Sequence, residues 1–396
     1  YMPERHFDSF GGLFSKPSIL ASVFARETSN IRLRQGTIIL PLHDPVSIVE
    51  EWATVDNLSN GRVDLCFGSG WDPLLYTFKP EKFQSRSEDL YDLIEQVSYL
   101  WQSGGKERRN GKGEQTVFNV FPRPKQENIN IWVTHANYIE MFRKAGSNGF
   151  NILTALFTQR SFDDLAVNIQ AYRKAREENG FDPEAGQVSI LVHAMVGESK
   201  KIRSIIEEPF KEYLIAALDL YNAADNEVEM TESQKKKIID RKFEEYFEEK
   251  ALFGDVDNCL KLVDKLYKSG VTEIINLIDF GVDEKQVLAA LPSLAELNTE
   301  IENKYGYKRR KHGRVARKIC DLSKPIDVLS HIKKVNYTQL IPCSFAQERL
   351  WFLDQYNNGN THFYNEPIAF KLRGKVDCIA LERSCNKLLE RHMSLR

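Results

Sequence analysis

Residues 33–71 read LRQGTIILPLHDPVSIVEEWATVDNLSNGRVDLCFGSGW, with two apolar segments separated by an amphipathic one. The apolar segments, 31–41 and 63–68, are rich in β-branched residues and almost continuous in hydrophobicity, which is typical of parallel strands covered on both faces. Between them, Asp44 before Pro45 predicts the start of a helix. The stretch therefore predicts a strand–helix–strand unit followed by a glycine-containing loop.

The same alternation continues to about residue 285. Further strands are predicted at 131–134, 150–155, 188–196 and 272–278. With a strand near Pro3 they make about seven strand–helix units, whereas a (β/α)8 barrel has eight in about 250 residues or more. We therefore expect an α/β fold, a (β/α)8 TIM barrel whose first βα unit lies before Tyr1. An open doubly wound sheet is the alternative, but the sequence has no GxGxxG or GxxxxGKS/T loop.

Four further helices are predicted from residues that commonly cap a helix. Ser85 together with Glu88 predicts a capping box before an apolar helical pattern. Asn137, Ser161 and Asp255 each precede another helical pattern and are expected to cap it.

Three segments depart from the alternation. Residues 103–130 predict a hairpin around 116–120, and residues 224–250 predict a charged helical insertion, both as long loops over one barrel face. Residues 303–318 are strongly basic and are interpreted as a solvated linker, with a nucleic-acid or localisation patch as the alternative.

Composition excludes several classes of protein. Of 396 residues, 54 are Lys or Arg and 56 are Asp or Glu, giving a net charge of −2, which argues against bulk binding to nucleic acid or to an anionic membrane. A hydrophobic content of 42% excludes a disordered chain. There is no apolar run of the roughly 20 residues that span a bilayer. The six cysteines lack zinc-type spacing, so we expect no metal site and a cytoplasmic location.

Polar clusters follow three of the predicted strands, where a barrel carries its functional groups. The first is Glu4-Arg5-His6. These side chains are costly to bury without a task, and His6 can transfer a proton near neutral pH. The alternative is a structural ion pair on a loop.

The second cluster is Gly68-Ser69-Gly70, which follows the strand at 63–68. Glycines allow the backbone to approach a planar ligand closely. A tight turn between strand and loop explains them equally well.

The third cluster spans Thr134, His135, Asn137 and Tyr138, at a predicted strand end and helix start. Such a position offers free N–H groups to a phosphate, and the alternative is ordinary capping by Asn137. His193 lies inside an apolar strand and is interpreted as a core histidine with its hydrogen bonds satisfied.

Taken together, these stretches resemble the bacterial luciferase-like flavin monooxygenases, and most closely the FMN-dependent members embedded in nonribosomal peptide and polyketide synthetases. The resemblance covers about residues 1–295 and implies the (β/α)8 fold. It is carried by five regions of the sequence: 3–18, 33–71, 122–137, 145–154, and 252–259 with 275–281.

The resemblance also implies functional residues. Glu4, Arg5 and His6 occupy the position of the luciferase Glu-His-His cluster, and Arg5 replaces a histidine implicated in catalysis, which leaves His6 as the acid/base candidate. Ser69 replaces an arginine that contacts the flavin, so other groups must bind the phosphate. The implied cofactor contacts are Ile38, Ile39 and Leu40 beneath the isoalloxazine ring, and Gly68, Ser69, Gly70, Thr134, His135, Asn137 and Tyr138 around the flavin.

The C-terminal part resembles a different family. Residues 344–353, SFAQERLWFL, are similar to the first core motif of synthetase condensation domains, and 391–396 to the start of the second. We therefore expect a barrel at 1–295, a basic linker at 296–336, and a truncated α+β condensation-domain fragment at 337–396.

The resemblance implies a monooxygenase that uses reduced FMN and O2 within a nonribosomal peptide synthetase. Its expected partners are a carrier protein with a phosphopantetheine-tethered substrate, a separate flavin reductase and the remainder of the synthetase, while a homodimer is left open. Two alternatives remain: a deazaflavin- or flavin-dependent dehydrogenase that transfers hydride on the same fold, and a non-catalytic docking domain.

Overall fold

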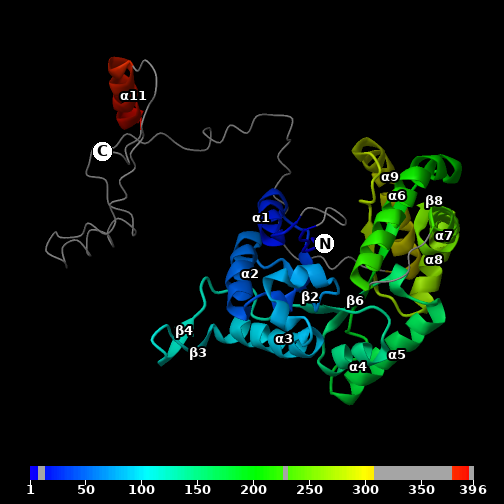
Figure 1. The fold of residues 1–396 in the computed structure, drawn as a ribbon, viewed down its shortest axis with the longest axis horizontal. Coiled ribbons are helices and arrows are strands. Elements are labelled where there is room, and N and C mark those ends of the chain that lie inside the picture. Colours follow the sequence, from blue (N-terminus) through cyan, green and yellow to red (C-terminus); the bar gives the residue numbers. More distant parts are fainter. Residues whose placement is uncertain (8–13, 226–230, 307–376, 392–396) are drawn as a thin grey trace. The chain divides into compact units, whose positions relative to one another are not determined.

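The computed structural model describes residues 1–7, 14–225, 231–306 and 377–391 (Figure 1). The chain divides into two compact units, 1–319 and 320–396. In the second unit the described element is helix α11 (Cys378–Arg391). The condensation-type motif at 344–353 lies outside the described residues.

The first unit is built on a seven-stranded parallel sheet. Its order is β1-β2-β5-β6-β7, with both β8 and β9 paired to β7, and a parallel bridge from Met2 to Gln35 adds the N-terminal segment beside β1. The strands are β1 (Leu33–Ile39), β2 (Val63–Gly68), β5 (Ile131–Thr134), β6 (Asn151–Ala155), β7 (Val188–Val196), β8 (Leu252–Gly254) and β9 (Glu273–Leu277). The predicted strands are confirmed; β8 was missed because three residues are too few to show a periodicity.

Helices cover the outer face of this sheet (Figure 1). They are α1 (Pro17–Glu27), α2 (Pro45–Ser59), α3 (Arg86–Ser103), α4 (Ile139–Ser147), α5 (Phe162–Glu178), α6 (Ser199–Asp225), α7 (Glu232–Glu245), α8 (Val256–Lys268) and α9 (Glu284–Tyr305). Strands β3 (Gly105–Arg109) and β4 (Gln115–Asn119) form the predicted antiparallel hairpin, and α7 confirms the charged helical insertion. Helix α9 continues past residue 295, and the three-part division of the chain stays a prediction.

Three of the predicted caps are confirmed. The side chains of Asp44, Ser161 and Asp255 each accept a hydrogen bond from a backbone N–H in the first turn of the following helix, at 2.8–3.0 Å. Each cap satisfies one of the N–H groups that a helix start leaves without a partner.

The predictions that Ser85 and Asn137 cap a helix are wrong. Ser85 makes no side-chain cap, because its hydroxyl donates to the Asp89 carboxylate instead. Asn137 does not cap α4, since that helix begins two residues later, after Tyr138, and no side chain caps it. The capping residues located both helices. They did not show that Ser85 would bond Asp89 instead, or that α4 would begin after Tyr138.

The sheet is curled, because its first and last strands touch across the inner face. Arg34 of β1 donates to Glu273 of β9 at 2.5 Å, although four strands lie between β1 and β9 along the sheet. The Arg34 guanidinium also lies 3.6 Å from the ring centre of Trp132 on β5. An α/β sheet with this curvature and helices outside is the arrangement of a (β/α)8 barrel, as predicted.

An irregularity in β1 decides which side chains reach the inside of the barrel. The register between β1 and β2 shifts between Gly36 and Ile38. An added residue reverses the in–out alternation beyond it, so Arg34 and Thr37 both face inward, whereas Ile38 packs in the outer core.

We predict that Gly68→Ala lowers the free energy of unfolding by about 1–3 kcal/mol, because an added Cβ would lie 2.7 Å from Thr37 Cγ2. Chemical denaturation measures the change. Thr37→Ser removes the clashing methyl and keeps the hydroxyl, so it should restore at least half of the loss in the double variant. Gly111→Ala is the matched control, because a Cβ at Gly111 meets nothing within 4 Å. An equal loss in the presence of Thr37→Ser would contradict the explanation.

Candidate active site

A buried carboxylate lies at the centre of the first predicted cluster. One oxygen of Glu4 accepts from His43 Nε2 at 2.7 Å and from His6 Nε2 at 2.9 Å. Its other oxygen accepts from the Ile39 backbone N–H at 2.9 Å. Glu4 thereby joins the N-terminal segment to the end of β1 and to His43, which follows that strand.

Glu4 is ionised at neutral pH. Burial raises the pKa of its carboxyl group, but the hydrogen bonds from His43, His6 and Ile39 outweigh burial and lower the pKa to about 2. An ionised carboxylate only accepts hydrogen bonds, so each histidine must carry its proton on Nε2. In a neutral His6, Nδ1 is then the free acceptor, which is the state a general base requires.

Aromatic rings border His6. Its ring meets Phe78 edge-on at 5.0 Å between centroids, and Phe7 at 5.9 Å. Arg5 faces a different environment from Glu4: its backbone N–H donates to the Phe14 carbonyl, and its side chain is half-buried. Of the three predicted catalytic residues, the structure thus joins Glu4 and His6 directly.

Inside the barrel, three small polar side chains from neighbouring strands come together. The hydroxyls of Thr37 and Thr134 lie 2.5 Å apart, and Cys66 Sγ lies 3.1 Å from the Thr134 hydroxyl. Burial raises the pKa of the Cys66 thiol to about 11, so it is a neutral group here. Thr134 was predicted as a site residue; Thr37 was missed, because its inward position depends on the register shift in β1.

The glycine-rich loop after β2 is explained largely by its neighbours. Gly68 has no room for a Cβ beside Thr37, and a Cβ on Gly70, which has a φ of +68°, would lie 2.9 Å from Ile39 Cγ2. The Ser69 carbonyl accepts from the Tyr76 hydroxyl, and the Gly70 carbonyl from Arg86. These contacts favour the interpretation of both glycines as residues of a tight turn. Contact of Gly68, Ser69 and Gly70 with a ligand stays a prediction.

The segment after β5 forms an uncapped helix start. Tyr138 is exposed, and no side chain caps α4. The Asn137 carbonyl accepts from Asn168. Gln159, which sequence reasoning missed, ties the segment to β6 through bonds from its amide to the Ala136 carbonyl and to Thr154. A helix start without a side-chain cap leaves backbone N–H groups for an anion.

His135 does not supply positive charge to this helix start. It is buried, stacks parallel to Tyr91 and pairs through Nε2 with the Tyr91 hydroxyl at 3.0 Å. Burial, together with the nearby Lys144 ammonium, lowers its pKa to about 4. His135 is therefore neutral, and its contact with Tyr91 joins the segment before α4 to helix α3.

The three residues predicted beneath a flavin ring occupy two different environments. Ile38 and Leu40 are buried in the outer core that β1 and β2 share with α1, α2 and α3. Ile39 instead packs with Leu42, Leu75 and Tyr76 at the end of the strand. Their contact with a flavin stays a prediction.

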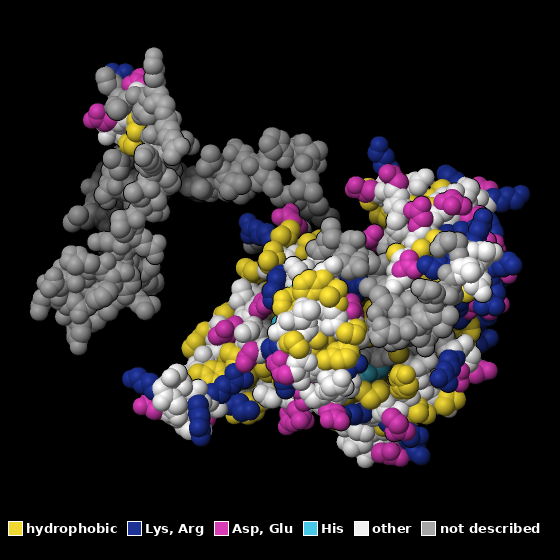
Figure 2. Space-filling model, viewed as in Figure 1, with side chains coloured by type: hydrophobic (Ala, Val, Ile, Leu, Met, Phe, Trp, Pro, Cys, Tyr) yellow, Lys and Arg dark blue, Asp and Glu magenta, His cyan; other side chains and the backbone are white. Residues whose placement is uncertain are grey.

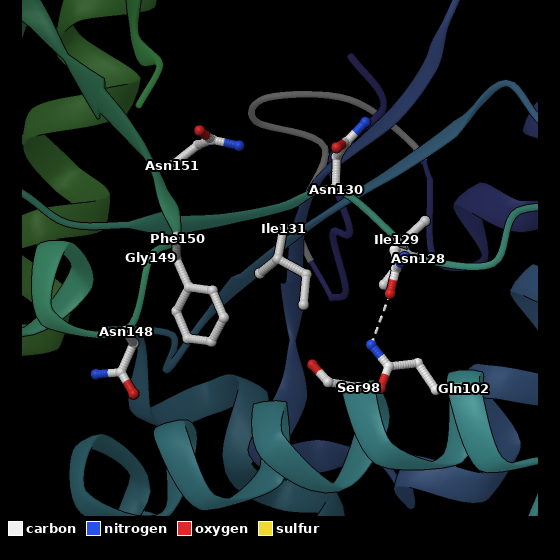
Figure 3. Close-up of a pocket in the computed structure, with 10 residues that line it drawn as sticks. All are labelled: Ser98, Gln102, Asn128, Ile129, Asn130, Ile131, Asn148, Gly149, Phe150 and Asn151. Carbon is white, nitrogen blue, oxygen red and sulfur yellow. Dashed lines mark hydrogen bonds between the residues drawn. The ribbon is translucent and has the colours of Figure 1, made fainter. Parts of the chain in front are cut away.

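A polar cavity of about 330 Å³ lies at the opposite end of the barrel (Figure 3). It is lined by amide side chains from α3 and from the segments that lead into β5 and β6, including Gln102, which donates to Asn128 at 2.8 Å. Active sites of such barrels lie at the carboxyl ends of the strands, so this cavity at the amino ends is not the candidate site.

Three further features concern the surface charge, groups that could bind a metal ion, and helices that could cross a membrane. Figure 2 shows acidic and basic side chains interspersed over the visible face of the first unit. Among the described residues, no group of His, Cys, Asp and Glu is arranged to hold a metal ion. In that same part of the chain, no helix combines the length and the apolar character needed to cross a membrane.

Comparisons with known proteins agree with this geometry. The model of the luciferase-like monooxygenase family matches residues 1–273, and that of the condensation domain matches residues 337–396. Because the first match covers more than half of the chain, the chain belongs to the luciferase-like monooxygenase family.

Curated relatives match the two parts separately. A component of the linear gramicidin synthase of Brevibacillus parabrevis is 50% identical over 56 residues, which are 14% of this chain and 1% of that component. The oxygenase component of the flavin-dependent trigonelline monooxygenase of Acinetobacter baylyi is 27% identical over 207 residues. That match covers 50% of this chain and 54% of the relative, so the chain spans at most about half the length of either protein.

Solved structures share the barrel fold. Monooxygenase RslO1 from Streptomyces bottropensis is similar with a TM-score of 0.60 at 20% identity, covering 76% of this chain and 87% of that one. The oxygenating constituent of 3,6-diketocamphane monooxygenase from Pseudomonas putida, in complex with FMN, reaches 0.57 at 17%, covering 76% and 88%. The coenzyme F420-dependent tetrahydromethanopterin reductase from Methanopyrus kandleri reaches 0.54 at 16%, covering 73% and 89%.

We predict that ionisation of Glu4 makes stability depend on pH at the acidic end. The carboxyl pKa is lower in the folded than in the unfolded chain, so its contribution is complete above the unfolded value of about 4.5 and is lost as pH falls towards about 2. The gap in unfolding free energy between wild type and Glu4→Gln should therefore shrink by about 2–3 kcal/mol from pH 6 to pH 2.

Urea unfolding at a series of pH values measures this gap. Glu50→Gln, at an exposed position on α2, is the control and should show little change. A gap for Glu4→Gln that stays constant with pH would show that the carboxylate is not held ionised by its histidines.

Proposed function

We propose that this chain is a flavin-dependent monooxygenase of a nonribosomal peptide synthetase, acting in the cytoplasm with reduced FMN and O2 on a carrier-bound substrate. The observation that carries the proposal is the Glu4–His6–His43 cluster at the end of β1, the strand that also carries the inward-facing Thr37. Membership of the luciferase-like monooxygenase family supports it.

The residues present fit a flavin mononucleotide. The uncapped start of α4 offers backbone N–H groups to a phosphate. The hydroxyls of Thr37 and Thr134 and the thiol of Cys66 offer neutral hydrogen-bonding groups inside the barrel. When bound, reduced flavin supplies the reaction with oxygen, whereas the protein supplies binding, orientation and exclusion of water.

His6 is proposed to move the proton. Glu4 holds the imidazole through Nε2 and leaves Nδ1 available to take or give a proton. Because Glu4 is ionised, it also stabilises the imidazolium that forms when His6 accepts a proton. Phe78 and Phe7 shield one side of the ring from water.

The neighbouring sequence supports a tethered substrate. Residues 337–396 match the condensation domain, and such domains belong to synthetases whose intermediates are carried as thioesters. We propose that a carrier protein presents the acyl group to the barrel and that a separate reductase supplies reduced FMN.

The second candidate is hydride transfer with a deazaflavin. It is favoured by the fold similarity to the F420-dependent reductase. Dehydrogenation of a substrate also needs a base to accept a proton, so the Glu4–His6 pair suits either reaction, and membership of the luciferase-like monooxygenase family favours the oxygenase. A non-catalytic docking domain would have no need of this pair, although burying its charged groups is energetically costly.

Oxygen consumption separates these candidates. We expect the full chain with reduced FMN and a carrier-bound acyl substrate to consume O2 in proportion to oxidised product. Substrate oxidation in the absence of O2, with oxidised F420 as the hydride acceptor, would instead establish the dehydrogenase, and failure to bind either cofactor would favour the docking role.

We predict that His6→Ala lowers turnover at least about tenfold while changing flavin affinity less than about threefold, because the imidazole moves a proton rather than holding the cofactor. Single-turnover kinetics and flavin titration measure the two quantities. His6→Gln, which can still donate to Glu4, should retain wild-type stability but not turnover. Equal losses of turnover and affinity would make His6 a binding residue instead.

A further inference from the structure

An apolar cavity of about 350 Å³ lies between β7, α6 and α7. Aromatic and aliphatic side chains make up most of its lining, including Phe157, Tyr213, Leu214 and Tyr246. Its volume is at the small end of the range of about 300–1,000 Å³ for ligand pockets.

His193 lines this cavity and contradicts the expectation for it. It is buried, with an exposed fraction of 2%, yet its Nε2 has no hydrogen-bond partner among the described residues. Rings of five aromatic residues surround it at 5.1–5.9 Å between centroids: Phe157, Phe210, Tyr213, Tyr246 and Phe280. A buried ring nitrogen without a partner loses its hydrogen bond to water and gains none in exchange, so this position is a candidate for contact with a ligand.

His193 lies on the inner face of the barrel at the carboxyl end of β7. Ser189, four residues earlier on the same strand, faces inward because it accepts from Trp132 Nε1 at 3.0 Å. The pairing of β6 with β7 ends at Leu191, one layer before His193, and His193 pairs with Leu277 of β9. The cavity therefore lies towards the carboxyl ends of the strands, the end of the barrel that carries Glu4 and His6.

The surroundings of His193 exclude charge. Burial lowers its pKa to about 3, so the imidazole is neutral at physiological pH. The lining also contains one basic residue, Lys242, which is half-exposed and whose ammonium pairs with Glu245 at 3.1 Å. A charged group inside this cavity would lose its hydration without a counter-ion.

A hydroxyl group is the partner that suits such a nitrogen best. Neutral imidazole carries a proton on only one nitrogen, so Nε2 is either a donor or an acceptor. A hydroxyl can satisfy both states, whereas a carbonyl satisfies only the donor. Aromatic walls add edge-to-face contacts for an aryl group.

We propose that this cavity is the substrate site for an uncharged, largely apolar acyl group that carries one hydroxyl, hydrogen-bonded to His193 Nε2. The inference rests on the proposed function, since attachment as a thioester removes the carboxylate charge that the cavity would reject. His193 then determines specificity and takes no part in the chemistry at the flavin.

Binding of pantetheine thioesters to the full chain without flavin tests the site directly. By calorimetry we expect 4-hydroxyphenylacetyl-pantetheine to bind about tenfold more tightly than phenylacetyl-pantetheine, the gain of one buried hydrogen bond. 4-Carboxyphenylacetyl-pantetheine, which carries a charge, should bind at least about tenfold more weakly than either.

Three variants separate the cavity from the rest of the protein. His193→Phe should abolish the difference between the hydroxylated and the unsubstituted probe and retain binding of both. Ala217→Trp, which fills the lining, should weaken both probes at least about tenfold, whereas Ala216→Trp, at the neighbouring exposed position, should not. Circular dichroism confirms that each variant is folded.

Equal affinity of the wild type for the hydroxylated and the unsubstituted probe would overturn the inference. So would a His193→Phe variant that still binds the hydroxylated probe more tightly. Because these measurements need neither flavin nor oxygen, they are independent of the proposed function. Probe binding as expected without O2 consumption would reject the oxygenase and keep the site; O2 consumption without discrimination would do the reverse.

Discussion

The contact between Arg34 and Glu273 joins strands that are far apart in the sheet, and the geometry of the site depends on the curvature it accompanies. In a flat sheet the carboxyl ends of β1, β5 and β7 would lie along one edge without facing one another across a common interior. Burying a guanidinium is costly unless it is paired, and here Glu273, the Trp132 ring and the more distant Asp64 compensate it. These paired charges lie towards the amino ends of the strands, whereas the side chains inside the barrel at the carboxyl ends are mostly neutral.

Glu4 couples this scaffold to the proposed chemistry. Its carboxylate receives two imidazoles and a backbone N–H of β1, so any change that moves β1 also moves His6. The same interior places an uncharged histidine, His193, across the barrel end on β7. Two histidines therefore have opposite roles: one is held beside an ionised partner and suits proton transfer, and the other is kept neutral and suits recognition.

The strands and most helix starts could be predicted because each depends on residues adjacent in sequence, as with Asp44 and Ser161. Glu4, His6 and Thr134 could be placed at strand ends by the same alternation. The inward position of Thr37 could not, because it follows from a register shift. Gln159 was missed because its partners lie elsewhere in the fold, and His193 was misjudged because an apolar strand pattern does not show whether a ring nitrogen finds a partner.

The central claim is that oxygen from O2 enters a carrier-bound acyl group at this barrel. Intact-protein mass spectrometry of the loaded carrier, after reaction of the full chain with reduced FMN, tests it most directly. We predict a gain of about 16 Da under ordinary oxygen and about 18 Da under oxygen-18, the mass of one oxygen atom in each case. A loss of about 2 Da with no dependence on the isotope would establish hydride removal and contradict the account.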